Sequence, residues 1–152
     1  RYHHDVVGVN SRLDSIQAAV LNAKLPLLDQ YNAARQNAAR KYSAAFEGHK
    51  NIIAPSICDI CDCHVFHQYT LRIIDRDRDG LMQHLLDKGI PCAIYYPIPL
   101  HSQKAYMDVR YKEADFPVTN LLAKQVISLP MHTELDDEQI KFITDSVLEY
   151  LK

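Results

Sequence analysis

The chain has 152 residues, 47% of them hydrophobic, and this size allows one domain that buries roughly 68–70% of its unfolded surface. Its formal net charge is −2, and its 17 basic residues are spread along the chain, which argues against a nucleic-acid partner. No apolar run reaches the ~20 residues of a membrane-spanning helix, and no signal-peptide pattern opens the sequence.

Three of the four cysteines lie within six residues of one another, unlike the spread framework of a small disulfide-rich secreted protein. We therefore expect a reduced, cytoplasmic protein without a membrane partner. The sequence begins at Arg1 and enters a helix as mid-chain sequence would, so we expect a fragment of a longer protein.

A long helical segment follows the first ten residues. Apolar residues recur every three or four positions from Leu13 to Ala45, which is the spacing of one helical face. Asn10 or Ser11 can cap its start. Pro26 donates no backbone hydrogen bond and clashes with the preceding turn, so we expect two abutting helices or one kinked helix.

Strands and shorter helices alternate after residue 48. The side chains of residues 65–74 alternate between two faces as in a half-buried strand, with His67 on the same face as Tyr69. Asp77 or Asp79 caps the next helix, residues 90–96 predict a second strand, and two short helices lead to a brief strand at residues 126–130. Asp136 and Gln139 form a capping box for the last helix.

This order of elements predicts an α+β fold with a small, mostly antiparallel sheet flanked by helices. We expect residues 1–48 to form an N-terminal segment with the long helix, kinked near Pro26, and residues 49–152 to form a small C-terminal α+β domain.

A cluster of cysteine and histidine is a candidate metal site. Cys58, Cys61, Cys63 and His64 can nominally supply four zinc ligands. All four crowd one strand entrance, whereas well-formed zinc modules bring a second ligand pair from a distant turn. We favour loop thiols that pack as small hydrophobic groups, with a non-catalytic zinc-binding module as the alternative.

The stretch from Asp75 to Gly80 begins like a calcium loop, with carboxylates at the first, third and fifth positions. The twelfth position, where a bidentate carboxylate is needed, is Leu86. The stretch therefore predicts a charged turn and a helix cap.

Several motifs occur in order along nearly the whole chain. The N-terminal ones are Tyr2-x-His4-x3-Gly8-x-Asn10-x-Arg12-Leu13-Asp14, Lys24-Leu25-Pro26-x-Leu28-Asp29 and Asn32-x2-Arg35. The later ones are His67-Gln68-Tyr69, Tyr96-Pro97-x-Pro99-Leu100-His101-x-Gln103-x-Ala105-Tyr106 and Ile127-Ser128-Leu129-Pro130-Met131-His132. With these motifs the chain closely resembles the DegT/DnrJ/EryC1/StrS family of sugar aminotransferases.

The resemblance implies the C-terminal small domain of a fold type I transferase that depends on pyridoxal 5′-phosphate, preceded by a helix that links two domains. Such enzymes move an amino group, usually from glutamate, onto a keto group of a nucleotide-linked sugar, here in amino-sugar and polysaccharide biosynthesis. None of the nine lysines lies in the sequence context of the family's Schiff-base lysine, so we expect the chain alone to be inactive.

The resemblance also implies a homodimer with the active site at the subunit interface. In the family an asparagine reaches the cofactor phosphate of the partner subunit, and it corresponds to Asn10. A side-chain amide can donate to phosphate oxygens at a helix start. The alternative for Asn10 is a helix cap and nothing more.

Four further residues are candidates for substrate binding: His4, Arg12, Tyr96 and His101. Histidine and arginine can bind sugar hydroxyls or a diphosphate, and two prolines stiffen the loop that carries Tyr96 and His101. The alternatives are an idle Arg12, a core Tyr96 and a His101 that caps a short helix. We expect His67 to be a satisfied core histidine. A family member that has lost catalysis and acts as a sensor is a further alternative.

Overall fold

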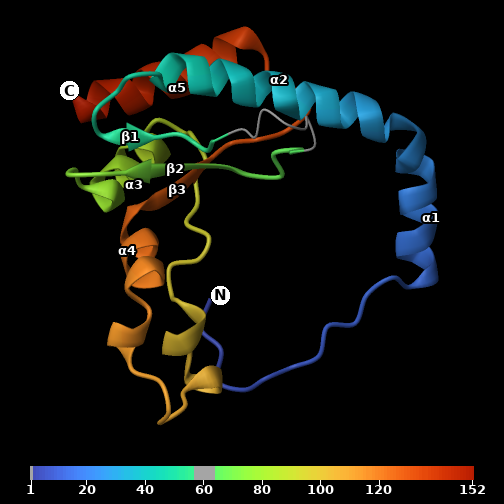
Figure 1. Ribbon diagram of the computed structural model, residues 1–152. Helices are drawn as coiled ribbons and strands as arrows, with labels where there is room; N and C mark the ends of the chain where they lie inside the picture. Colours follow the sequence, from blue (N-terminus) through green and yellow to red (C-terminus); the bar gives the residue numbers. More distant parts are fainter. Residues whose placement is uncertain (1, 57–63) are drawn as a thin grey trace.

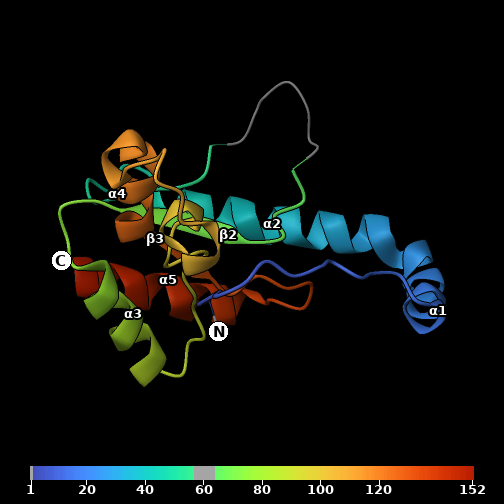
Figure 2. The ribbon, with the colours of Figure 1, turned by 90° about the horizontal axis from the view of Figure 1, so that it is seen from below.

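The computed structural model describes residues 2–56 and 64–152. A three-stranded antiparallel sheet has the order β1 (Ile52–Ile53), β2 (Tyr69–Ile73) and β3 (Val126–Leu129). Figure 1 shows α2 (Leu28–Phe46) and α5 (Asp137–Leu151) running side by side over this sheet, and α3 (Arg78–Asp87) packs against α5 (Figure 2). The predicted α+β class with a small antiparallel sheet is confirmed.

Strand β2 lies at the centre of the sheet and separates an apolar face from a polar one. Tyr69, Leu71 and Ile73 are buried in the core under α2 and α5. On the opposite face Thr70 contacts the Ser128 hydroxyl at 2.7 Å, within a register that pairs Tyr69 with Leu129. This alternation is the pattern that the sequence predicts for a strand with one buried face.

The observed strand is shorter than the predicted one, and this changes the position of His67. Phe66 has a φ of 46°, in the left-handed region that interrupts an extended strand. Phe66 is therefore buried while His67 is exposed, which reverses the expected alternation. The prediction of a buried core histidine at position 67 was wrong.

Residues 90–96 do not form the predicted strand. Ala93 makes one isolated antiparallel bridge with Ser128, with backbone hydrogen bonds of 3.1 and 2.7 Å. Pro91 has no N–H to donate, so a ladder cannot extend in that direction. The segment still packs beside β3, and it leads the chain toward the residues around position 100.

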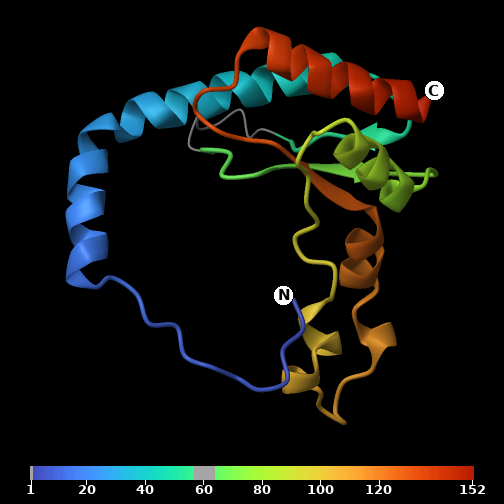
Figure 3. The same ribbon diagram turned by 180° about the vertical axis from the view of Figure 1, so that it is seen from behind.

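The long helical segment divides at Pro26, as expected. Helix α1 (Ser15–Lys24) is followed by the 3₁₀ turn η1 (Leu25–Leu27) and then by α2. Figure 3 shows α1 bending away from α2 at this turn. Pro26 cannot continue the α-helical hydrogen-bond ladder, and a tighter turn accommodates it.

The start of α1 differs from the prediction. Neither Asn10 nor Ser11 caps it; Asp14 does, by accepting a 2.8 Å hydrogen bond from the backbone N–H of Gln17. The Gln17 side chain in turn accepts from the N–H of Leu13 at 2.9 Å. This reciprocal arrangement satisfies two free donors at once, which Asn10 in its extended segment cannot do.

Local capping signals elsewhere are confirmed. Asp77 accepts from the N–H groups of Asp79 and Gly80, both at 3.0 Å, and so starts α3. Asp136 and Gln139 form the capping box of α5. The short helices are the 3₁₀ turns η2 (Leu100–Ser102), η3 (Lys104–Tyr106) and η4 (Glu113–Asp115), followed by α4 (Pro117–Gln125).

One hydrophobic core lies between α2, α3, α5 and the sheet, and its fully buried side chains include Tyr42, Leu71, Leu85, Ile127 and Val147. By contrast, α1 has no buried residue and exposes apolar side chains such as Ile16, Val20 and Leu21. Among the described residues no helix is both long and apolar enough to span a membrane. The division into an N-terminal segment and a C-terminal domain at residue 48 stays a prediction.

Candidate active site

A cavity of about 850 Å³ lies where the N-terminal segment, the loop after residue 94 and α4 meet. The N-terminal segment contributes Tyr2, His4 and Asn10 to its wall. The remaining lining residues are Tyr95, Tyr96, Ile98, Pro99, Leu100, Gln103, Tyr106, Thr119, Leu122, Ala123 and Val126. A concave, mostly apolar site with few polar groups is the usual form of a small-molecule site.

Three of the five predicted site residues lie on this one cavity: His4, Asn10 and Tyr96. Figures 1 and 3 show the start of the described chain beside the segment around residue 100, which brings distant parts of the sequence together. The local periodicity of the sequence contains no information about this approach.

Asn10 is exposed at the cavity and makes no hydrogen bond within the described residues. Because Asp14 caps α1, the alternative reading of Asn10 as the helix cap is wrong. Its amide therefore retains two donors and one acceptor for a ligand.

Tyr96 has 66% of its surface exposed, so the alternative in which it packs in the core is also wrong. Its ring lies edge-on to those of Tyr2 and Tyr95, with centroids 6.1 and 5.9 Å away. Such edge-to-face pairs stabilise ring orientation. The three tyrosines form an aromatic side of the cavity.

The other two predicted residues lie elsewhere. His101 stacks on Phe116, with ring centroids 4.3 Å apart, and lines a separate cavity of about 400 Å³ with Asp108 and Lys112. Arg12 is exposed, belongs to the lining of neither cavity, and has no hydrogen bond or ion pair within the described part of the chain. The roles proposed for His101 and Arg12 stay predictions.

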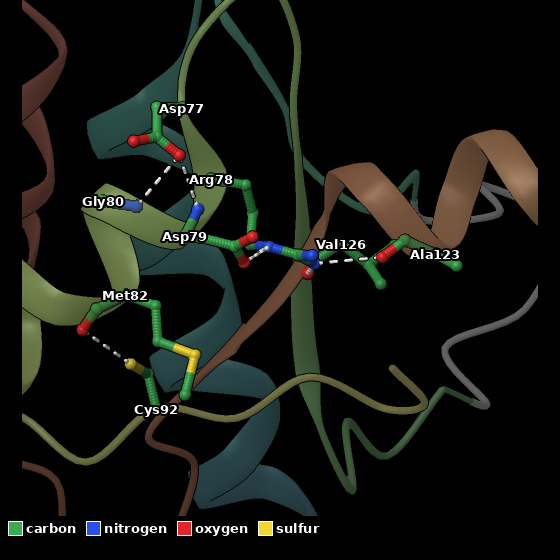
Figure 4. Close-up of polar contacts among 8 residues, drawn as sticks. All are labelled: Asp77, Arg78, Asp79, Gly80, Met82, Cys92, Ala123 and Val126. Carbon is green, nitrogen blue, oxygen red and sulfur yellow. Dashed lines mark hydrogen bonds and ion pairs between the residues drawn. The ribbon is translucent and has the colours of Figure 1, made fainter. Parts of the chain in front are cut away.

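Two residues that were not among the predicted site residues hold the cavity walls. Gln103 is only 6% exposed and bonds the backbone of the N-terminal segment through both ends of its side-chain amide. Arg78 is 9% exposed and donates to the carbonyl oxygens of Ala123 and Val126, at 3.1 and 2.6 Å, where α4 ends (Figure 4). The only sequence signal for Gln103 was its place in the His101-x-Gln103 motif.

A second cavity, of about 670 Å³, lies at the junction of α1 and α2. It brings Asn32 and Arg35 of one resemblance motif together with His132 of another. Arg35 donates to the backbone carbonyl of Met131 at 3.4 Å, so the two motifs meet directly. The motif residues therefore gather at two separate cavities.

Residues 2–56 and 64–152 contain no group of three or more His, Cys, Asp or Glu side chains that can hold a metal ion. Cys58, Cys61 and Cys63 lie outside the described residues. The zinc-binding alternative therefore stays a prediction.

Comparisons with known proteins identify the class. The sequence profile of the DegT/DnrJ/EryC1/StrS aminotransferase family matches residues 1–148. UDP-2-acetamido-2-deoxy-3-oxo-D-glucuronate aminotransferase of Pseudomonas aeruginosa is 42% identical over 143 residues, covering 94% of this chain and 38% of that protein. A pleiotropic regulatory protein of Geobacillus stearothermophilus is 38% identical over 154 residues, covering 100% of this chain and 41% of that protein. The crystal structure of S. venezuelae DesV superposes with a TM-score of 0.84 at 35% identity, covering 100% of this chain and 40% of that chain.

The chain therefore belongs to the DegT/DnrJ/EryC1/StrS aminotransferase family, as its motifs predicted. Its fold is that of a C-terminal small domain in a fold type I transferase. The chain spans between 38% and 41% of the length of these relatives.

Pyridoxal 5′-phosphate is the cofactor of this family. The residues present fit a part of that group, because the Asn10 amide is free to donate to phosphate oxygens at the cavity. Among the described residues no lysine lines the cavity. The contact of Asn10 with the cofactor stays a prediction.

Proposed function

We propose that this chain is the C-terminal part of an aminotransferase that moves an amino group from glutamate to the keto group of a nucleotide-linked sugar. One observation carries the proposal: His4, Asn10 and Tyr96, which the family resemblance selects from distant parts of the sequence, line a single cavity. The Pseudomonas aeruginosa relative is by its name an aminotransferase of a UDP-linked oxo sugar, which supports the substrate class.

Each cavity residue has a role that its chemistry allows. Asn10 would donate hydrogen bonds to the phosphate of pyridoxal 5′-phosphate held by the partner subunit of a homodimer. His4 and Tyr96 would bind hydroxyl or diphosphate oxygens of the sugar nucleotide, with Arg12 and His101 as further contacts. The cofactor, when bound, supplies an electron sink for the amino-group transfer.

The covalent chemistry would lie outside this chain. A nucleophilic amine must bind the cofactor, and the lysine that does so in the family lies upstream of the matching motifs. We therefore expect the full-length homodimer to be active in the cytoplasm and the 152-residue chain alone to be inactive.

The test uses the full-length protein purified with pyridoxal 5′-phosphate. Incubated with ¹⁵N-labelled glutamate and UDP- or dTDP-linked keto sugars, it should transfer the label to the sugar and release 2-oxoglutarate, both measured by mass spectrometry. The 152-residue chain alone is the control and should transfer none. Cofactor binding without transfer to any keto sugar would overturn the proposal.

The second candidate function is that of a sensor that has lost catalysis. The Geobacillus stearothermophilus relative, which is named a pleiotropic regulatory protein, supports this candidate. The upstream sequence distinguishes the two. Presence of the cofactor-binding lysine supports the enzyme, and its replacement by another residue supports the sensor.

A further inference from the structure

Gln103 lies between the 3₁₀ turns η2 and η3 with only 6% of its surface exposed. A buried amide costs free energy unless its donor and acceptor are both paired. Both are paired here, and with the backbone of a segment about a hundred residues earlier. The Gln103 side chain therefore fixes a chain segment that is distant in the sequence.

The two hydrogen bonds are complementary. The Gln103 Nε2 donates to the carbonyl oxygen of Tyr2 at 2.7 Å, and its Oε1 accepts from the N–H of His4 at 3.1 Å. The N–H of Ala105 then donates to the carbonyl oxygen of His4 at 2.9 Å. Together they hold the N-terminal segment against η3 much as a neighbouring strand would.

The next part of the segment has no comparable support. Residues 6–12 make no hydrogen bond within the described part of the chain, and the following bonds belong to the cap of α1. The exposed ion pair between Lys104 and Asp5, at 3.2 Å, adds little, because surface pairs are largely screened by solvent. The position of Asn10 is therefore set from two ends, by the contacts of Gln103 and by the start of α1.

We propose that Gln103 is a positioning residue of the cavity, whose side-chain amide fixes the backbone of Tyr2 and His4 and thereby places His4 and Asn10 in the cavity wall. The part of this inference that concerns the cofactor rests on the proposed function. The part that concerns the segment does not, and the two are measured separately.

Two variants separate hydrogen bonding from packing. Gln103→Met keeps the length and most of the volume of the side chain and removes both hydrogen bonds. Gln103→Glu keeps the acceptor for the N–H of His4. It replaces the amide nitrogen, which lies 2.7 Å from the Tyr2 carbonyl oxygen, by a carboxylate oxygen that repels this carbonyl. When protonated, that carboxyl can donate to the Tyr2 carbonyl again, so acid should restore the contact in this variant alone.

The first measurement is hydrogen–deuterium exchange by mass spectrometry on the full-length protein without added cofactor. At pH 8 the backbone amide of His4, resolved by overlapping peptides within residues 2–14, should exchange about tenfold faster in both variants than in the wild type, while α5 is unchanged. At pH 5.5 the exchange rate of the Gln103→Glu variant should approach that of the wild type at the same pH. The exchange rate of Gln103→Met should stay faster. The titratable groups that face this contact, His4, Asp5 and Lys104, are common to all three proteins, so their titration cancels in the comparison.

The second measurement is the Kd for pyridoxal 5′-phosphate at pH 8, read from its visible absorbance. Both variants should bind about tenfold more weakly, because Asn10 is no longer held in place, and Lys104→Ala should bind as the wild type does.

Unchanged exchange of the His4 amide in both variants would overturn the proposal. Faster exchange of α5 to the same extent would also overturn it, because Gln103 would then act on global stability. Faster exchange of the His4 amide with an unchanged cofactor Kd would reject the link to Asn10 while the segment contact stands. Failure of the wild type to bind the cofactor would reject the proposed function. The role of Gln103 in holding the N-terminal segment would then be judged by the exchange measurement alone.

Discussion

Arg78 donates a 2.6 Å hydrogen bond from Nη1 to the carbonyl oxygen of Val126, and this contact ties the start of α3 to the junction of α4 and β3. The same nitrogen donates to Ala123 at 3.1 Å, so one buried guanidinium satisfies two carbonyl groups where α4 ends (Figure 4). Ala123 and Val126 both line the cavity, so Arg78 supports one of its walls from behind.

Replacing Arg78 by Met should therefore destabilise the fold by about 2–3 kcal/mol, because two partly buried carbonyl oxygens lose their donor. Urea unfolding of the 152-residue chain followed by circular dichroism measures the change. Arg110→Met is the matched control, since Arg110 is exposed and pairs with Asp108 on the surface, and it should unfold as the wild type does. Equal effects of the two substitutions would contradict this account.

The buried Tyr42 should make the fold sensitive to alkali. Burial raises the pKa of Tyr42, and the neighbouring Tyr69 raises it further; burial also raises the pKa of Tyr69, against a lowering by the Ser43 hydrogen bond. A raised pKa in the folded state means that the stability is complete below the ordinary tyrosine pKa of about 10 and is lost as the pH rises above it.

The free energy of unfolding should therefore fall more steeply between pH 9.5 and 11 in the wild type than in Tyr42→Phe, as measured by urea titrations. At pH 8 this variant should lose about 1 kcal/mol, because its ring keeps its packing and the carbonyl oxygen of Pro130 loses a 3.0 Å hydrogen bond. Identical slopes in alkali would show that Tyr42 does not titrate with unfolding.

Cys92 should react slowly with alkylating agents. Burial raises the pKa of its thiol, and its Sγ lies 3.7 Å from the carbonyl oxygen of Met82 (Figure 4). Because the thiolate is the reactive form, iodoacetamide at pH 8 should label Cys92 about tenfold more slowly in the folded chain than in urea. Peptide mass spectrometry separates this thiol from the other cysteines. Equal rates in the two conditions would contradict the prediction.

Asn10 should contribute to cofactor affinity in the full-length protein. Asn10→Ala should raise the Kd for pyridoxal 5′-phosphate about tenfold, since a hydrogen bond to a charged phosphate is lost, and Asn10→Asp should raise it further by adding a negative charge. Asn22→Ala is the control, because Asn22 is exposed on α1 and lies on the other cavity. An unchanged Kd in both Asn10 variants would remove the proposed contact.

The zinc-binding alternative has a direct measurement. Elemental analysis of protein purified without added metal should find less than stoichiometric zinc if the cysteines near residue 60 are loop thiols. One zinc ion per chain, lost on replacing Cys58 and Cys61 by Ser, would establish the metal module instead.

The sequence by itself determined the features that depend on near neighbours. The Asp136 capping box, the Asp77 cap and the break at Pro26 were all predicted, because each follows from hydrogen bonds made or lost within one turn of the chain. The buried face of β2 was also predicted, since alternation along a strand is a local property. Family membership came from motifs and their order.

Only the tertiary structure decided how these pieces meet. The positive φ of Phe66 turned His67 outward, and a single bridge at Ala93 replaced a predicted strand. The contact of Gln103 with Tyr2 and His4 joins segments about a hundred residues apart, and it forms the cavity wall that carries Asn10. No local pattern encodes such a contact, because its formation depends on loop closure and on the packing of the whole core rather than on the preferences of neighbouring residues.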